Sequence, residues 1–466
     1  MKIVNPIDVI NKSRVHSFHI LLVAWLFFVL MFDGYDVVIY GAVVSTLMEE
    51  WGMSDVMGGA IGSYTVAGTA VGAVIFGLMA DKVGRKRVII LCTALFSLFT
   101  FLAGFATSAG IFTVCRIIAG LGLGGVMPNI IALVTEFAPQ KRRTALVAFV
   151  FAGYSTGAVV AALTSRALLP TVGWKPTFWI AIIPIILLPL IMKSVPESVA
   201  YLIEKGKMDK VKGILTKVDP SISPADRIEI PKRVQSVAGS TFSQLFQEKR
   251  TFSTIMFWIA FFCSLLLVFA MNTWLPRLLM AAGFDLSSSL LFTAVMQLGA
   301  ILGTVVLGPV MDRIGFKKVL VPLFFSGAIA LALIGYSKNT AIVLGLITII
   351  GAATIGVQNL SNTFVSQYYP THMRATAIGS TMAFGRIGGI LAPLIVGVLL
   401  SMNLQPQYNF GVIGIASLIG GVALLFVQEK HAIYREEKKV DEKHEKERSE
   451  TIPKIAEADA NYTSRI

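Results

Sequence analysis

Charged residues are scarce in this sequence. Only 14% of its 466 residues are Asp, Glu, Lys or Arg, whereas 55% are hydrophobic, and the mean hydropathy is +0.74. A soluble globule of this length needs more polar residues than that to cover its surface. The composition therefore predicts an all-α membrane protein that crosses the bilayer many times, and it excludes a water-soluble domain.

Cysteine and histidine are rare as well. Cys92, Cys115 and Cys263 all lie in apolar segments, which argues against a disulfide framework. The five histidines fall at helix ends, in loops or in the tail, so none is placed to carry a proton through a membrane. No metal-ligand spacing, phosphate-binding loop or nucleophile with its base is recognisable. We predict that the chain is not an enzyme and binds no cofactor or metal.

Long hydrophobic runs dominate instead. Twelve have about the length that spans a bilayer, near residues 18–43, 56–79, 88–108, 111–135, 144–168, 174–193, 253–275, 287–310, 319–337, 341–366, 375–400 and 409–427. They predict an amino-terminal six-helix half at 1–193, a cytoplasmic connector at 194–252, a carboxy-terminal half at 253–427 and a charged cytoplasmic tail at 428–466. The first run is too long for a cleavable signal and is expected to remain as a helix.

The net charge of +13 suggests nucleic acid as a partner until the charges are located. Most lysines and arginines lie in the two ends, the connector and every second loop, which is the pattern of positively charged cytoplasmic loops. We therefore predict a plasma membrane protein with both termini in the cytoplasm and the lipid bilayer around it. No basic patch carries a motif that reads nucleic acid. We expect a monomer.

Two acids interrupt the first apolar run. Asp33 and Asp36 are three residues apart and Tyr40 follows four later, so on a helix all three share one face. Acids within a membrane helix face protein or a water-filled cavity, and they commonly mark proton or ligand sites. Arg116 is expected within about a turn of the same depth, so its guanidinium can face them. The alternative is a structural pair that the arginine neutralises.

Arg386 is the second charged residue inside an apolar run, midway along 375–400. The equivalent position of the first half is Ser155, so the shared fold does not require this charge. A lone guanidinium at that depth suits a carboxylate ligand, which it binds through two hydrogen bonds. The alternative is an internal ion pair. Further polar or aromatic candidates for substrate contact, each of which could instead join helices, are Tyr40, Asn129, Tyr154, Asn272, Gln297, Gln358 and Asn362.

An internal repeat relates the two halves. The loop segment Gly77–Arg87 has a weaker copy at Gly308–Lys318, 231 positions later, and the same offset relates Pro139–Gly157 to Pro370–Gly388. Two homologous halves in parallel orientation, with a site between them, are typical of transporters.

The repeated loop contains the candidate conformational residues. Gly77 and Gly84 are expected to permit a tight turn and close helix approach, and Asp81 to cap or pair at a helix end. Glu136 is expected to pair with the arginine-rich loops, whose basic residues could also serve only as membrane anchors. The full candidate set is Gly77, Asp81, Gly84, Arg85, Glu136, Asp312 and Arg374.

These motifs resemble a known family. Gly77–Arg87 is similar to the loop signature of the major facilitator superfamily, and Pro196-Glu197-Ser198 resembles its sugar and organic-acid branches. Asp33-Gly34-Tyr35-Asp36 resembles the first-helix signature of the aromatic acid:proton symporters. Together with Gly124–Asn129, it is similar to that of benzoate transporters.

The resemblance implies twelve membrane helices in two six-helix halves related by a pseudo-two-fold axis. It also implies import of an aromatic monocarboxylate, benzoate or a hydroxybenzoate, together with a proton by alternating access. Arg386 would then bind the carboxylate, while Asp33 and Asp36 exchange the proton beside Arg116. The alternatives are a proton-driven exporter of amphipathic compounds, an importer of a nicotinate-type carboxylate, and a sensor that transports nothing.

Overall fold

The computed structural model describes residues 3–219, 227–228, 241–370 and 373–433. Within them, the extended structure is one two-residue parallel pairing, β1 (Ile3–Val4) with β2 (Arg227–Ile228), and nearly everything else is helical. Twelve helical segments are long and apolar enough to cross a membrane. The predicted all-α, twelve-span fold is confirmed, and most of the predicted tail, 434–466, lies outside the described residues.

The first six spans are continuous helices or short helices joined end to end. They are α2 (Ser17–Trp51), α3 (Asp55–Val83), α4 (Arg85–Ala103), α5 (Ala109–Phe137), η1 (Gln140–Arg142) with α6 (Arg143–Val172), and α7 (Lys175–Trp179) with η2 (Ile180–Ile182) and α8 (Ile183–Ser194). Large apolar side chains on their outer faces, such as Val74 and Ile186, are exposed because lipid replaces water there.

The last six spans repeat this plan. They are α12 (Thr251–Ala281), α13 (Leu286–Ile314), α14 (Phe316–Ile334), α15 (Thr340–Gly351) with the π-helical turn η3 (Ala352–Gly356) and α16 (Val357–Tyr368), α17 (Arg374–Ser401) and α18 (Pro406–Phe426). Short helices lie outside the spans: α1 (Pro6–Lys12), α9 (Val199–Glu204), α10 (Met208–Val218), α11 (Thr241–Gln244) and η4 (Glu429–His431).

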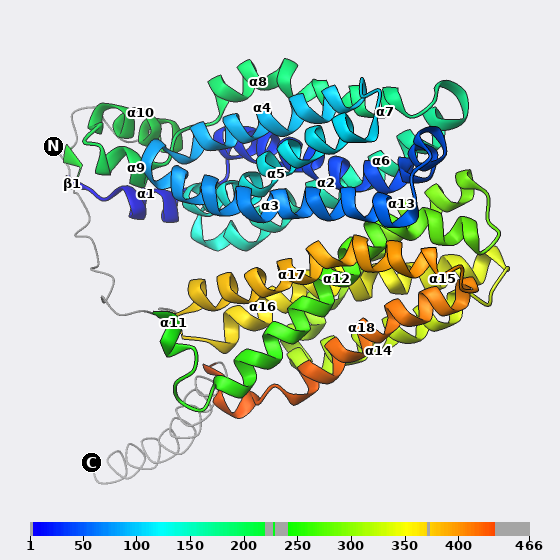
Figure 1. Ribbon diagram of the computed structural model, residues 1–466. Coiled ribbons are helices and arrows are strands. Elements are labelled where there is room, and N and C mark those ends of the chain that lie inside the picture. The colour runs from blue at the N-terminus through cyan, green and yellow to red at the C-terminus, as the bar shows by residue number, and fades with distance from the viewer. Residues whose placement is uncertain (1–2, 220–226, 229–240, 371–372, 434–466) are drawn as a thin grey trace, which may run out of the picture.

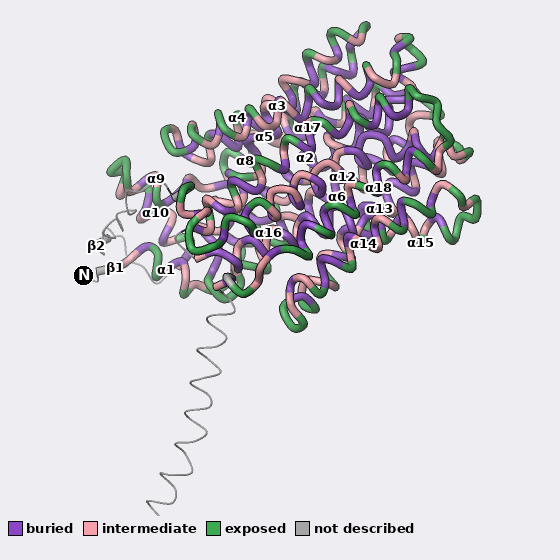
Figure 2. The backbone as a smooth tube through the Cα atoms, turned by 60° about the horizontal axis from the view of Figure 1, so that its bottom comes forward, coloured by how far each residue is buried: buried purple, intermediate pink, exposed green. Residues whose placement is uncertain are grey.

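The helices form two bundles that pack against each other (Figure 1). Within the first bundle α2 packs on α6 and α3 on α5, and the equivalent pairs of the second bundle, α12 with α17 and α13 with α15, also pack. Between bundles, α3 packs on α17 and α6 on α13. A two-fold axis exchanges these last two contacts, which is the relation expected from the repeat. Buried residues follow the inner helix faces (Figure 2).

The two bundles approach most closely on the side opposite the amino terminus, which we call the distal side. Here a Cβ on Gly59 would collide with the carbonyl of Pro393, and one on Gly397 with the carbonyl of Asp55. Gly41 similarly lies against the Asn272 carbonyl. Small residues allow such backbone contact between membrane helices. In Figure 1, α3 and α17 accordingly converge toward this side and diverge toward the side of α1 and α10, the terminal side.

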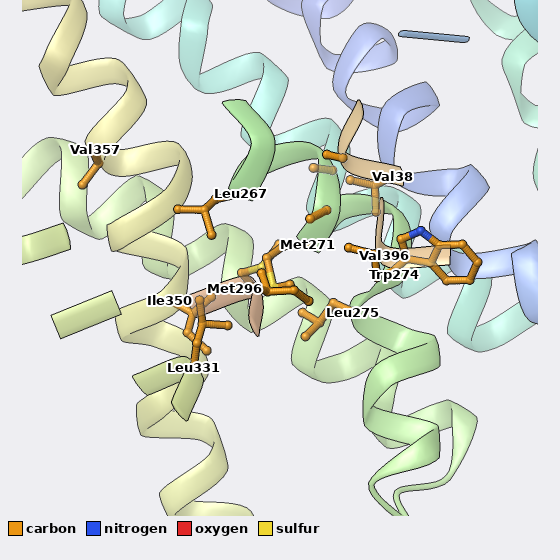
Figure 3. Packing of buried hydrophobic residues seen from close by; sticks show 14 of the residues in the cluster. Val38, Leu267, Met271, Trp274, Leu275, Met296, Leu331, Ile350, Val357 and Val396 are labelled. Carbon is orange, nitrogen blue, oxygen red and sulfur yellow. The ribbon is translucent and has the colours of Figure 1, made fainter. Parts of the chain in front are cut away.

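Apolar packing of the second bundle supports the distal contact. Trp274 of α12 is fully buried, and its indole nitrogen donates to the Pro393 carbonyl at 2.8 Å. Figure 3 shows this ring beside Val38 of α2 and Val396 of α17, so it touches both bundles. The ring thereby holds α17 in place against α12.

Candidate transport site

Asp36 is held entirely within the first bundle. Arg116 of α5 donates through Nη1 to both carboxylate oxygens of Asp36, at 2.8 and 2.9 Å, and through Nη2 to its backbone carbonyl at 3.3 Å. Thr100 of α4 donates a further hydrogen bond to Oδ1. The Arg116 and Asp36 side chains are each 2% exposed. This is a closed ion pair, so Asp36 matches the structural alternative raised by the sequence.

Asp33 lies one turn from Asp36 toward the terminal side and is in a different situation. It is buried, yet its carboxylate makes no hydrogen bond or ion pair with the residues that the structure describes. Its electrostatic interactions are with Asp36 and Tyr154 and with Arg386, which belongs to the other bundle. Arg116 therefore faces only one of the two acids, and the second is left available for chemistry.

Arg386 reaches from α17 across to the first bundle. Its Nη1 donates to the backbone carbonyl of Thr69 in α3 at 2.9 Å, and no other described atom accepts from the guanidinium. The backbone around it is tightly packed, because a Cβ on Gly388 would collide with the Phe262 carbonyl of α12. A rigid helix thus presents a partly satisfied cation at the plane between the bundles, near Asp33.

Carboxamides gather inside the second bundle. Gln297 of α13 donates through Nε2 to Asn272 Oδ1 of α12 at 2.8 Å, while Asn272 Nδ2 and Gln297 Oε1 are buried without a partner. Gln358 of α16 has no partner for either side-chain amide atom. Asn362, on the same face, donates to the Gln358 backbone carbonyl at 3.1 Å and leaves its own oxygen unpaired. Buried polar atoms of this kind are costly unless a ligand or water satisfies them.

An apolar wall separates the two groups of carboxamides. Val268, Ala300 and Ile355 form a small buried cluster apart from the main core. Each lies about one helical turn from Asn272, Gln297 or Gln358 on the same span, so the wall has carboxamides on both sides. The π-helical turn η3 contains Ile355 and ends directly before α16, and such turns are common at functional sites. The arrangement suits a flat ring with polar substituents.

The three remaining substrate candidates differ in availability. The Tyr40 hydroxyl donates to the Gly58 carbonyl at 2.5 Å, and the Arg116 guanidinium carbon lies 5.9 Å from the Tyr40 ring centre, so Tyr40 supports the ion pair. Asn129 Nδ2 donates to the Gly125 carbonyl of its own helix at 2.8 Å. Tyr154 makes no hydrogen bond to the described residues and interacts electrostatically with both Asp33 and Asp36. Tyr154 is the one of these three that is free to meet a ligand.

The conformational loop corrects two expectations. Asp81 is exposed and pairs with no described residue; the acid at this corner is Glu197, whose Oε1 accepts from the backbone N–H groups of Lys86 and Ser198, both at 3.0 Å. Glu197 thereby caps the start of α4, which is the role that the sequence assigned to Asp81. A Cβ on Gly77 would meet nothing within 4 Å, so no helix approaches it closely.

Gly84 does require glycine, because its φ is +101° and a Cβ there would collide with the Glu197 carboxylate. The role of Glu197 was missed because the Pro-Glu-Ser motif follows the sixth span, more than 100 residues from the loop that it caps. Only the recurrence of that motif in related branches hinted at it.

Glu136 connects this loop to the connector. Its Oε2 accepts from Arg85 at 3.0 Å, and its Oε1 accepts from the Ser198 hydroxyl at 3.0 Å and from the Ala200 backbone at 2.8 Å. The second half lacks an equivalent network among its described residues: Asp312 is exposed and unpaired, and Arg374 Nε is buried without a partner. Among the described residues, this network of ion pairs and hydrogen bonds at the repeated loop is therefore present in the first half and absent from the second.

Comparison with known proteins places the fold. Residues 26–393 match the Major Facilitator Superfamily. The chain is 39% identical to the benzoate transport protein of Acinetobacter baylyi, over 92% of this chain and 93% of that one, and 34% identical to the gentisate transporter of Corynebacterium glutamicum, over 90% and 89%. The structure resembles the partially occluded, inward-open xylose transporter XylE of E. coli, with a TM-score of 0.70, 16% identity, and 88% and 100% coverage. The chain belongs to the Major Facilitator Superfamily and is a multi-pass membrane transporter, not an enzyme.

Proposed function

We propose that this transporter imports an aromatic monocarboxylate together with a proton. The observation that carries the proposal is a pair of incompletely paired charges from opposite bundles. Arg386 of α17 reaches the Thr69 carbonyl of α3 with further donors free, and Asp33 of α2 is buried without a hydrogen-bond partner among the described residues. The names of the relatives support the substrate class, since they include transporters of benzoate, gentisate and 4-hydroxybenzoate.

The substrate carboxylate binds Arg386. This guanidinium has donors that no described residue uses, and two parallel N–H donors match a carboxylate in geometry and charge. The ring then packs on the wall formed by Val268, Ala300 and Ile355, and ring hydroxyls meet the carboxamides beyond it. Tyr154 is available to contact the ligand from the first bundle.

Coupling to the proton follows from charge repulsion. Two carboxylates about 4 Å apart repel by roughly 4 kcal/mol at an effective dielectric constant of 20. A substrate carboxylate on Arg386 competes with Asp33 for the same cation and repels it, so a loaded site favours neutral Asp33. One proton therefore enters with each anion. Asp36 takes no part in this exchange, since Arg116 and Thr100 already bind its carboxylate.

The two bundles rock around this site. We place the termini in the cytoplasm, in keeping with the distribution of basic residues. The distal side, where the bundles are in contact, is then the outer one, and this arrangement supports an inward-facing state. We propose a monomer in the plasma membrane, since the site is complete within one chain.

Transport by the purified protein in proteoliposomes tests the proposal. Radiolabelled benzoate should accumulate under an inward proton gradient, and a protonophore should abolish the accumulation. Excess unlabelled hydroxybenzoate, nicotinate and a cationic dye rank the substrates in the same assay. Accumulation that ignores the protonophore would exclude proton symport, and extrusion of the dye without benzoate uptake would indicate an exporter.

A further inference from the structure

A cavity opens on the distal side, away from the central site. Its volume is about 410 Å³, and it lies where the start of α3, the end of α12, the end of α17 and the start of α18 meet. Cavities that bind small molecules commonly measure about 300–1,000 Å³. It is therefore large enough for a single aromatic acid, and it is accessible while the distal contact is closed.

An ion pair between the bundles lies in this cavity. Arg277 of α12 places Nε 3.5 Å from Oδ1 of Asp55 in α3, and among the ion pairs of the described residues it is the one that joins the two bundles. The pair is loose, because that Asp55 oxygen makes no hydrogen bond. The two terminal nitrogens of Arg277 donate to no described residue, and its side chain is 32% exposed.

The remaining lining is suited to an amphipathic ligand. Met280, Leu400 and Leu404 supply apolar surface close to the guanidinium. Asn409 also lines the cavity; it is 2% exposed, and its Oδ1 is buried without a partner. That oxygen can accept from a ring hydroxyl, which an apolar ligand would lack.

We propose that this cavity is an outer docking site for aromatic carboxylates. The carboxylate takes the two terminal nitrogens of Arg277, and the ring lies on Met280, Leu400 and Leu404. This inference rests on the proposed function and orientation, because they determine the ligand and the side from which it arrives.

Occupation of the site loosens the closed distal contact. A ligand carboxylate beside Arg277 competes with Asp55 for its positive charge and repels the Asp55 carboxylate. The ion pair between Asp55 and Arg277, which joins the two bundles, is thereby weakened when an anion arrives from outside. Substrate thus promotes the opening that admits it to the central site.

Thiol labelling tests the docking site directly. The three buried cysteines, Cys92, Cys115 and Cys263, are replaced by alanine, and Leu404→Cys serves as the reporter because Leu404 is exposed. All measurements are made with Arg386→Ala, which weakens benzoate binding at the central carboxylate site. We expect saturating benzoate to slow labelling by a membrane-impermeant maleimide at least threefold.

Two matched controls identify the contact. Protection should disappear with Arg277→Gln and persist in part with Arg277→Lys, which keeps the charge but not the paired donors. A reporter at Tyr336→Cys, exposed outside the cavity, should be labelled at the same rate with and without benzoate.

The outcomes separate this inference from the proposed function. The docking site is excluded if benzoate does not change the labelling rate at Leu404→Cys. It is also excluded if benzoate still protects this cysteine in the Arg277→Gln variant. Neither result touches central transport, which is measured separately by proton-driven uptake in the protein that retains Arg386.

Discussion

Asp33 of α2 and Arg386 of α17 come from different bundles and interact electrostatically, whereas Asp36, three residues along the same helix, is bound by Arg116 of its own bundle. Two neighbouring acids thus have unlike surroundings. Asp33 can exchange partners when the bundles move or a substrate binds, whereas Asp36 keeps its partner throughout such a motion. This difference separates the first two predictions.

Asp33→Asn should uncouple transport from the proton. Asparagine keeps the size of the side chain and cannot ionise, so substrate can still reach Arg386 but no proton is exchanged. We expect gradient-driven accumulation of benzoate to be lost, while exchange of labelled for unlabelled benzoate persists. Asp209→Asn, on the exposed surface of α10, is the matched control. Accumulation by Asp33→Asn at the wild-type level would show that another group carries the proton.

Asp36→Asn should instead destabilise the fold. It leaves the buried Arg116 guanidinium without a counter-ion, and breaking one side of a buried pair costs about 3–5 kcal/mol. We expect a lower yield and a lower melting temperature in detergent. The double variant with Arg116→Gln should recover part of the loss, because it removes the uncompensated charge. A single variant as stable as the wild type would contradict a structural role for the pair.

Arg386→Ala should weaken substrate binding. Hydrogen bonds to a charged group contribute about 1.5–3 kcal/mol. Because about 1.4 kcal/mol corresponds to a tenfold change in affinity, we expect KM for benzoate to rise roughly 10- to 100-fold. Arg386→Lys should recover only part of the affinity, since lysine lacks the paired donors. The measurement is initial-rate uptake over a range of benzoate concentrations. Unchanged KM in both variants would place the carboxylate elsewhere.

Gln358→Leu should change the choice of ring. The unpaired Gln358 carboxamide gains a hydrogen bond from a ring hydroxyl and nothing from a bare ring. We expect hydroxybenzoate to lose about 1 kcal/mol of binding free energy relative to benzoate, measured as the ratio of their inhibition constants. Asn359→Leu is the matched control, because Asn359 is directed at Thr304 of α13 instead. Equal effects of the two variants would argue against hydroxyl recognition by Gln358.

The sequence predicts the spans, the two halves and the unusual charges because the bilayer imposes strong rules on composition. A charge such as Arg386 inside an apolar run is conspicuous wherever it packs. Which groups meet is harder to predict, because it depends on helix rotation. Depth in the membrane alone allowed Arg116 to face both Asp33 and Asp36. In the packed helices, its guanidinium binds Asp36.

Residues at the helix ends were harder still. Asp55 and Arg277 read as ordinary loop charges in the sequence, and their contact exists only because the two bundles meet on the distal side. Glu197 was likewise hidden by its separation from the α4 terminus that it caps. Contacts of high sequence separation, between residues common at any membrane surface, leave no local pattern.

The two glycines of the repeated loop differ in whether this structure requires glycine: Gly84 does and Gly77 does not. Gly84→Ala should destabilise the protein, because a positive φ of +101° and the adjacent Glu197 carboxylate both oppose a Cβ; such backbone strain costs about 1–3 kcal/mol. Gly77→Ala should leave the melting temperature nearly unchanged, since open space surrounds that Cβ position. Both variants are compared in detergent by thermal unfolding. If Gly77→Ala keeps its stability yet slows uptake, a helix must approach Gly77 in a conformation other than this one, and the glycine is then needed for the motion between conformations.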